Sequence, residues 1–148
     1  TESVNKAVEN GTSYKIGKSE VIRGGEDLTL LTWGSMLHVA KEVADKLSSE
    51  NIEIEIIDAR TLIPFDAETC VSSVIRTGRL VVLQEGQWFG GIGHSMLSRI
   101  LEDAFYALES VPVVIGALDT PVPFSPPLEN HTIPNASHVE DVIRRLIG

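Results

Sequence analysis

The stretch over residues 79–101 constrains the fold of this chain most strongly. It opens with an apolar run at 80–83, which is bounded by turn-forming residues and predicts a buried strand. The strand ends on Glu85, a loop with four glycines follows, and a long amphipathic helix comes next. Because ligands and partner chains usually meet an open α/β sheet at the carboxyl ends of its strands, we expect the working edge of the protein here.

Strands and helices alternate along the chain. Apolar runs and period-two alternation predict the strands, and apolar residues at helical spacing predict the helices. The predicted strands cover 19–23, 28–33, 52–57, 80–83 and 111–118, and the predicted helices end near residues 47, 76, 108 and 147. This order predicts an α/β fold with three layers, α/β/α, in which a mostly parallel sheet carries helices on both faces and right-handed crossovers.

Several polar residues have predicted structural roles. Ser35 and Asp66 stand directly before helical segments and are good N-caps. Glu53 and Glu55 alternate on one face of a strand, so we expect a solvated or interface-facing surface there. Cys70 is the only cysteine, which excludes an internal disulfide, and its apolar neighbours predict a small core residue.

Composition limits the class of protein. The 148 residues, 43% hydrophobic and 22% charged, suit one globular domain. A net charge of −9 argues against a nucleic-acid partner and permits a basic protein partner. No apolar run is long enough to span a membrane, and no signal segment opens the chain. Residues 1–18 are polar and predict an interdomain connector before a domain at 19–148, and prolines predict an extended connector at 119–127.

The glycine-rich loop invites comparison with phosphate-binding loops. Its Gly91-Ile-Gly93 is followed by Met96 where a dinucleotide fingerprint needs a third glycine, so a small nucleotide-binding protein is the weaker hypothesis. A tight strand-to-helix turn with close approach of another backbone explains the glycines better. Trp88 and Phe89 on the same loop are either a lid on the core or an anchor at an interface, where aromatic residues are enriched.

Evidence for catalysis is sparse. The four histidines have no metal-ligand spacing, and no nucleophile–base signature is present. His94 lies at the mouth of the helix behind Glu85, where an imidazole could act as an acid or base, but a structural role is favoured. We therefore predict no catalytic, cofactor-binding or metal residue, and a candidate interface or active-site entrance formed by Glu85, Trp88, Phe89, Gly90, Gly91 and His94.

Five ordered motifs resemble one known family. They are EDLTLLTWGS at 26–35, IDARTLIPFD at 57–66, SVIRTGRL at 73–80, Glu85 with GGIG at 90–93, and DTPVPF at 119–124. Together they resemble the C-terminal domain of the transketolase family. Within that family, they resemble the version of the domain found in the beta subunit of the thiamine-dependent 2-oxo acid decarboxylase. This enzyme is a component of the pyruvate, branched-chain 2-oxo acid and acetoin dehydrogenase complexes. The segment at 14–18 is similar to the one that enters this domain from a preceding one.

The resemblance implies a five-stranded sheet with one antiparallel strand, for which 19–23 is the candidate. It also implies that thiamine diphosphate and magnesium bind in the full enzyme between an alpha subunit and the N-terminal domain of the beta subunit. The family's Gly-Asp-Gly metal motif and activating glutamate belong to those parts and are absent here. We therefore expect this polypeptide alone to bind no cofactor and to catalyse nothing.

The implied role is assembly. The family packs beta against beta in an alpha2-beta2 heterotetramer and offers a surface to an acyltransferase core, whose binding domain is typically basic and suits an acidic chain. Candidate contacts on that surface are Glu109, Arg144 and Arg145. The loop at 86–89 departs from the proline-bearing loop of many relatives, so its role does not transfer in detail. The alternative is a free-standing interaction module. The implied compartment is the bacterial cytoplasm, the mitochondrial matrix or a plastid.

Overall fold

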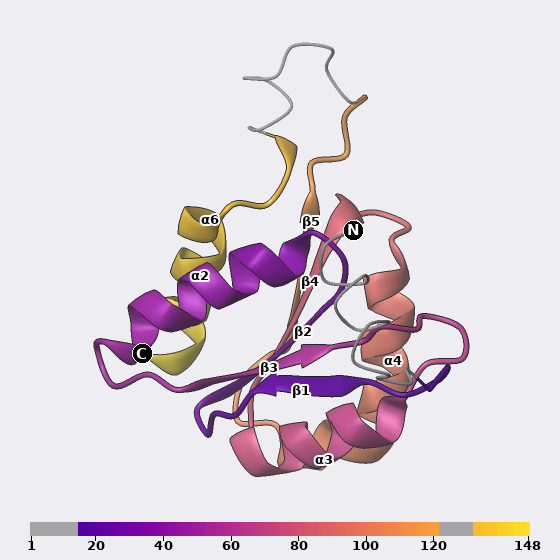
Figure 1. Cartoon of the computed structure of the whole chain (residues 1–148), viewed down its shortest axis with the longest axis horizontal. Helices are drawn as coiled ribbons and strands as arrows, with labels where there is room; N and C mark the ends of the chain where they lie inside the picture. Colours follow the sequence, from indigo (N-terminus) through magenta and orange to yellow (C-terminus); the bar gives the residue numbers. More distant parts are fainter. Residues whose placement is uncertain (1–14, 122–131) are drawn as a thin grey trace, which may run out of the picture.

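The computed structural model describes residues 15–121 and 132–148, which form a five-stranded sheet between two helix layers (Figure 1). The predicted connector at 1–18 and the proline-rich segment lie largely outside the described residues. The elements are β1 Glu20–Arg23, β2 Leu28–Thr32, α2 Met36–Ser48, β3 Ile54–Asp58, α3 Ala67–Thr77, β4 Leu80–Gln87, α4 Ile92–Ala104, the 3-10 turn η1 Phe105–Ala107, β5 Val113–Ala117 and α6 Ala136–Ile147.

The strand order is β1-β3-β2-β4-β5, with β2 in the centre. Strand β1 pairs antiparallel with β3, and the other pairs are parallel. The predicted α/β class and the antiparallel assignment of the first strand are both confirmed. Within the described residues, no helix has the length and apolar character that crossing a membrane requires.

The core has two halves, one on each face of the sheet. Helices α2 and α6 cover one face, and α3 and α4 cover the other (Figure 1). All five residues of β2 are buried because helices cover both of its faces. Its two threonines are satisfied there: the Thr29 hydroxyl lies 2.6 Å from that of Ser73, and the Thr32 hydroxyl donates to the Leu83 carbonyl at 2.9 Å.

The predicted caps had mixed outcomes. Asp66 caps α3, because its carboxylate accepts a hydrogen bond from the Thr69 amide, and Asn135 caps α6 in the same way through His138. Ser35 occupies the N-cap position of α2 as predicted, but its side chain makes no cap hydrogen bond. Its hydroxyl instead donates to the carboxylate of Glu85.

Two element boundaries differ from prediction by more than two residues, and the other boundaries agree with it to within two residues. Strand β4 continues to Gln87, because an irregularity in its pairing with β5 between Leu83 and Gln87 carries the ladder further. Gly116 permits that close approach, since a Cβ there would lie 2.9 Å from the Gly86 carbonyl oxygen. Helix α4 ends at Ala104 and tightens into η1, short of the predicted end near residue 108.

Glu55 is not on a solvated surface as predicted. Its residue is only 4% exposed, and its carboxylate pairs with the guanidinium of Arg76 on α3. Glu53, which precedes β3, is exposed. The alternation was correct, but α3 covers the sheet at Glu55, and a buried carboxylate needs a charged or hydrogen-bonded partner.

Candidate functional site at the carboxyl edge of the sheet

At the carboxyl ends of the adjacent strands β2 and β4, the chain leaves the sheet toward opposite faces. Strand β2 leads into α2 on one face, whereas its neighbour β4 leads into α4 on the other. Loops that leave adjacent parallel strands in opposite directions open a crevice, which is the usual position of a site in such sheets. The hydrogen bond from Ser35 to Glu85 joins the two diverging loops at this point. Glu85 is exposed, as an edge residue should be.

Gln84 holds the loop after β4 in shape. Its side chain is 2% exposed, and its Oε1 accepts a hydrogen bond from the Gly93 amide at 2.8 Å. Its Nε2 donates to the Gln87 carbonyl at 2.7 Å. One amide therefore joins the strand end to the first turn of α4. Sequence reasoning missed this residue; the available signal was a polar residue directly after an apolar strand and before a glycine-rich loop.

Two glycines of the loop, Gly91 and Gly93, make room for that amide. A Cβ at Gly91 would lie 1.8 Å from Nε2 of Gln84, and a Cβ at Gly93 would lie 2.7 Å from its Oε1. Gly90 has a φ of 74°, which favours glycine. These contacts lie within the chain, so the loop needs no phosphate to explain its composition.

Trp88 and His94 pack together beside the loop. Their ring centroids are 4.9 Å apart with an interplanar angle of 89°, an edge-to-face contact. The indole N–H donates to the Val114 carbonyl at 3.1 Å. His94 Nδ1 is buried and has no hydrogen-bond partner among the residues described. Within that part of the chain, no hydrogen bond or ion pair joins His94 to Glu85, so the structure shows no acid–base pair.

Phe89 projects from the loop. Its residue is 77% exposed, against 48% for Trp88. Its amide donates to the carboxylate of Asp119 at 2.8 Å, which ties the loop to the segment after β5. A side chain so exposed does not cover the core, so interface anchoring is the better of the two interpretations for Phe89. Trp88 packs on His94 and still presents about half of its surface, so both interpretations stay open for it.

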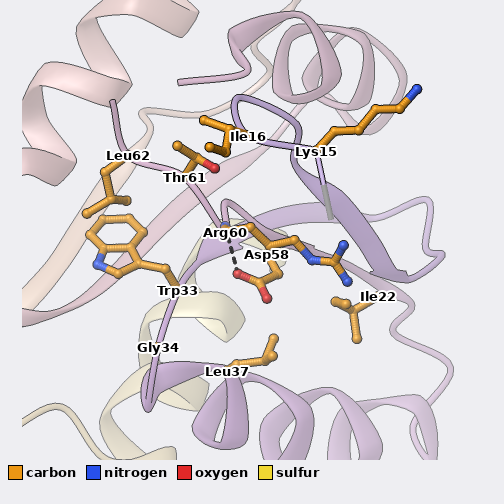
Figure 2. Close-up of a pocket in the computed structure, with 10 residues that line it drawn as sticks. All are labelled: Lys15, Ile16, Ile22, Trp33, Gly34, Leu37, Asp58, Arg60, Thr61 and Leu62. Carbon is orange, nitrogen blue, oxygen red and sulfur yellow. Dashed lines mark hydrogen bonds between the residues drawn. The ribbon is translucent and has the colours of Figure 1, made fainter. Parts of the chain in front are cut away.

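A cleft of about 600 Å³ adjoins this edge, at the carboxyl ends of β2 and β3 (Figure 2). Trp33 and Leu62 lie together on one side of it, and Asp58 lies near its centre beside Arg60. The Asp58 carboxylate accepts from the Arg60 amide at 3.0 Å, and the Arg60 guanidinium pairs with Glu20. The wall is largely apolar and its charges are of both signs, which suits contact with another protein surface better than a catalytic role.

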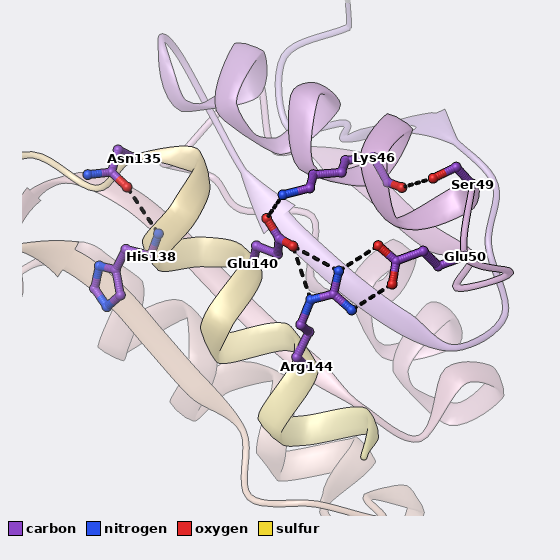
Figure 3. A network of polar contacts seen from close by, with 7 residues as sticks. All are labelled: Lys46, Ser49, Glu50, Asn135, His138, Glu140 and Arg144. Carbon is purple, nitrogen blue, oxygen red and sulfur yellow. Dashed lines mark hydrogen bonds and ion pairs between the residues drawn. The ribbon is translucent and has the colours of Figure 1, made fainter.

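Arg144 is engaged within the fold (Figure 3). Its guanidinium donates to both carboxylate oxygens of Glu50, in the turn after α2, at 2.7 and 2.8 Å, and to Glu140 on its own helix, at 2.8 and 3.0 Å. Lys46 also pairs with Glu140 at 2.7 Å. These hydrogen bonds raise the pKa of Arg144. This network, formed by Lys46, Glu50, Glu140 and Arg144, joins α6 to α2.

Glu109 lies at the opposite edge of the sheet, near the amino end of β4. Its carboxylate pairs with Arg79 at 3.0 Å, and Arg79 Nε donates to the Leu146 carbonyl at 3.1 Å. Arg79 thus brings Glu109 beside the end of α6. Arg145 donates to the Asp141 carbonyl and is exposed. The candidate partner surface stays a prediction, with Glu109 and Arg145 more available than Arg144.

The single cysteine is internal. Cys70 is fully buried, and burial, followed by the nearby charges of Asp66 and Glu55, raises the pKa of its thiol to about 12. Among residues 15–121 and 132–148, no three His, Cys, Asp or Glu side chains gather closely enough to hold a metal ion.

A family model described as the transketolase C-terminal domain matches residues 17–139. The pyruvate dehydrogenase E1 component subunit beta of Rickettsia bellii is 33% identical over 93% of this chain and 42% of its own length. The corresponding subunit of Bacillus subtilis is 36% identical over 91% of this chain and 41% of its own. The acetoin:2,6-dichlorophenolindophenol oxidoreductase subunit beta of Cupriavidus necator is 38% identical over 93% of this chain and 40% of its own. The chain therefore spans about two fifths of these relatives.

Solved structures give the same fold. A split-gene transketolase, described as an inactive beta4 tetramer, superimposes with a TM-score of 0.78 at 27% identity, over 93% of this chain and 44% of its own. A 2-oxoglutarate:ferredoxin oxidoreductase from Magnetococcus marinus gives a TM-score of 0.63 at 15% identity, over 97% of this chain and 21% of its own. The second likeness concerns the fold alone.

Proposed function

Because this chain belongs to the transketolase C-terminal domain family, we propose that it serves as the C-terminal assembly domain of a beta subunit in a thiamine diphosphate-dependent 2-oxo acid dehydrogenase. The observation that carries the proposal is the match of 91–93% of the chain to the beta subunits of two pyruvate dehydrogenase E1 components and of one acetoin oxidoreductase, at 33–38% identity. The chain spans about two fifths of each, so the remainder of the activity belongs to parts outside these residues.

The full enzyme oxidatively decarboxylates a 2-oxo acid and passes the acyl group to the lipoyl group of an acyltransferase. Thiamine diphosphate, held with magnesium between the alpha subunit and the N-terminal domain of the beta subunit, supplies the carbanion chemistry. In this proposal, the residues of this chain form part of the entrance to the active site. Gln84 fixes the loop, and Phe89 and Glu85 face outward from it. The lack of any Glu85–His94 contact among the described residues supports a role in positioning over one in proton transfer.

The proposed partners are the alpha subunit, a second beta subunit and the acyltransferase core. The net charge of −9 favours a basic acyltransferase domain, since opposite charges steer association. Glu109 and Arg145 remain the candidate contacts for it, because Arg144 is already occupied by two carboxylates.

A chimera tests the proposal directly. This chain replaces the matching C-terminal part of the Cupriavidus necator subunit, which is then co-expressed with its alpha subunit. We expect thiamine diphosphate-dependent turnover from the chimera and none from the same subunit cut before the replaced part. The isolated chain, titrated calorimetrically with thiamine diphosphate and magnesium, should give no saturable heat.

A matched pair of variants of the chimera distinguishes a specific role of the exposed loop residue Phe89 from a general effect of changing an exposed apolar residue. Phe89→Ser should lower activity or assembly, whereas Ile75→Ser, on the exposed side of α3, should not. Saturable cofactor binding by the isolated chain would contradict the assembly role. An inactive, unassembled chimera that is nonetheless folded would favour the free-standing interaction module instead.

A further inference from the structure

The cleft beside Asp58 has the size and the lining of a small-molecule site. Its volume of about 600 Å³ lies within the range of about 300–1,000 Å³ that is usual for ligand pockets. Three parts of the chain line it: the region of β1 and the residues before it, the turn from β2 into α2, and the turn after β3 (Figure 2). The mixed charges that suit a protein surface also suit a small charged molecule, and the concave shape favours the small molecule.

One side of the cleft is apolar. Trp33 and Leu62 lie together there, and Leu37, in the first turn of α2, lies near Asp58 (Figure 2). All three apolar side chains belong to residues that are only partly buried. An apolar ligand group that covers them gains the free energy of leaving water.

Asp58 supplies a carboxylate near the centre of the cleft. Its Oδ1 accepts a hydrogen bond from the Arg60 amide at 3.0 Å, and its other oxygen has no hydrogen-bond partner among residues 15–121 and 132–148. The guanidinium of Arg60 pairs with Glu20. A partly buried carboxylate is best satisfied by a donor that carries positive charge, such as an ammonium group.

The backbone around Asp58 is shaped before any ligand arrives. Arg60 has a φ of 53°, which is uncommon for a residue other than glycine, and the Thr61 amide donates to the Ala59 carbonyl. Residues held in such conformations cluster at ligand sites. Across the cleft, Gly34 also has a positive φ, of 62°, and a Cβ there would meet nothing within 4 Å. A sharp turn at each strand end therefore borders the hollow.

A positive group and a hydroxyl complete the lining. Lys15 is exposed at the rim, and its ammonium has no ion-pair partner in the part of the chain that the structure describes. Thr61 Oγ1 accepts from the Gly17 amide at 3.2 Å, so its own hydrogen can be donated to a ligand. Both groups suit a carboxylate. The cleft thus offers an acceptor for a cation, donors for an anion and an apolar wall.

We propose that this cleft binds a free α-amino acid with an apolar side chain. Its ammonium donates to Asp58, and its carboxylate accepts from Lys15 and Thr61. Its side chain lies against Trp33 and Leu37. A ligand with a single charge would satisfy only one of the two polar sets, whereas an α-amino acid satisfies both. The inference goes beyond the proposed function and uses none of the residues of the proposed entrance.

Calorimetric titration with L-leucine and two of its analogues tests the proposal. We expect leucine to bind the isolated chain with a dissociation constant of about 1 mM or lower. Isocaproate lacks the ammonium group and isoamylamine lacks the carboxylate, and each should bind at least about tenfold more weakly, because a hydrogen bond to a charged group is lost. L-Phenylalanine is the second amino acid of the series.

Variants place the binding in the cleft. Asp58→Asn keeps the oxygen that accepts from the Arg60 amide but removes the charge, so leucine binding should weaken at least about tenfold. Asp27→Asn is the matched control: Asp27 also accepts one backbone amide, that of Glu53 at 2.7 Å, but lies before the amino end of β2. Lys15→Met should weaken leucine binding about two- to fivefold and leave isoamylamine binding unchanged. Circular dichroism checks that each variant is folded.

Absence of saturable binding by both leucine and phenylalanine in the millimolar range would overturn the inference. Equal binding of isoamylamine and leucine would also overturn it, since the cleft would then accept a cation alone, as from a lysine side chain of a partner protein. Equal losses in Asp27→Asn and Asp58→Asn would place the binding elsewhere. These outcomes are separable from the proposed function: leucine binding with an inactive chimera keeps this site, and an active chimera without leucine binding keeps only the function.

Discussion

Gln84 determines the local geometry of the carboxyl edge. Its buried amide hydrogen-bonds to the Gly93 amide and to the Gln87 carbonyl, and so fixes where α4 begins. The sequence made the glycines conspicuous and pointed to Glu85 as the notable polar residue. It did not reveal Gln84, because side-chain direction at the end of a strand depends on the irregular pairing with β5, which no local pattern encodes.

A substitution at Gly91 tests this arrangement. Gly91→Ala places a Cβ 1.8 Å from Nε2 of Gln84, so the amide must move and leave buried polar groups unpaired. We expect a loss of about 2–4 kcal/mol in the free energy of unfolding, measured by urea denaturation. Gly86→Ala is the matched control, since a Cβ there meets nothing within 4 Å, and it should cost less than about 1 kcal/mol. Equal losses in the two variants would contradict the role of Gln84.

Cys70 should be inert in the native chain. With the pKa of its thiol raised to about 12, roughly 10⁻⁴ of the thiol is ionised at pH 8, and the residue has no exposed surface. We expect no reaction with a colorimetric disulfide reagent at that pH until denaturant unfolds the chain, when one equivalent should react. Rapid native labelling would show that the packing around α3 opens readily.

The elements of the fold were predictable because each depends on local periodicity. Strand β2 is a continuous apolar run, and α6 repeats its buried residues at helical spacing. Glu55 could not be placed, since its burial depends on α3 crossing above it, which is a tertiary fact. The interface candidates stay predictions. The exposure of Phe89 suits its candidate role, but the pairing of Arg144 with Glu50 could not be predicted, because it depends on α6 meeting the end of α2 from a distant part of the chain.

The contact between α2 and α6 should weaken in acid. A hydrogen bond from Arg144 lowers the pKa of Glu50, and bonds first from Lys46 and then from Arg144 lower that of Glu140. Their stabilising effect is present above the ordinary carboxyl pKa of about 4.5 and is lost as the pH falls below it through the lowered values. Arg144→Met keeps the apolar stem and removes these pairs.

The measurement is the melting temperature between pH 3 and pH 7. Arg144→Met should lie below the parent at neutral pH and approach it in acid, and high salt should reduce the difference. Arg145→Met is the control on the same helix, because within the described residues Arg145 donates only to a carbonyl. A gap between Arg144→Met and the parent that stays constant with pH would exclude an electrostatic origin.

The whole molecule should unfold as one unit. The two core halves lie on opposite faces of a single sheet, so neither can open while the other keeps its strands. Val43→Ala, on the buried face of α2, and Val74→Ala, on the buried face of α3, should each cost about 1–3 kcal/mol in the free energy of unfolding.

Each of these variants should show one transition that coincides by circular dichroism and tryptophan fluorescence. Ile75→Ala, which is exposed on α3, is the control and should have little effect. A biphasic curve for one face only would mean that the helix layers fold separately.

The position of α6 also affects how the protein is made. This last helix completes the face that α2 begins, and its Val139 and Ile143 are fully buried there. During synthesis, these residues leave the ribosome after every other helix and strand of the sheet, so the nascent chain carries an open apolar face until α6 has emerged. Ribosomes stalled before Ala136 should therefore yield chains that bind chaperones and are cut readily by protease, and emergence of α6 should abolish both properties.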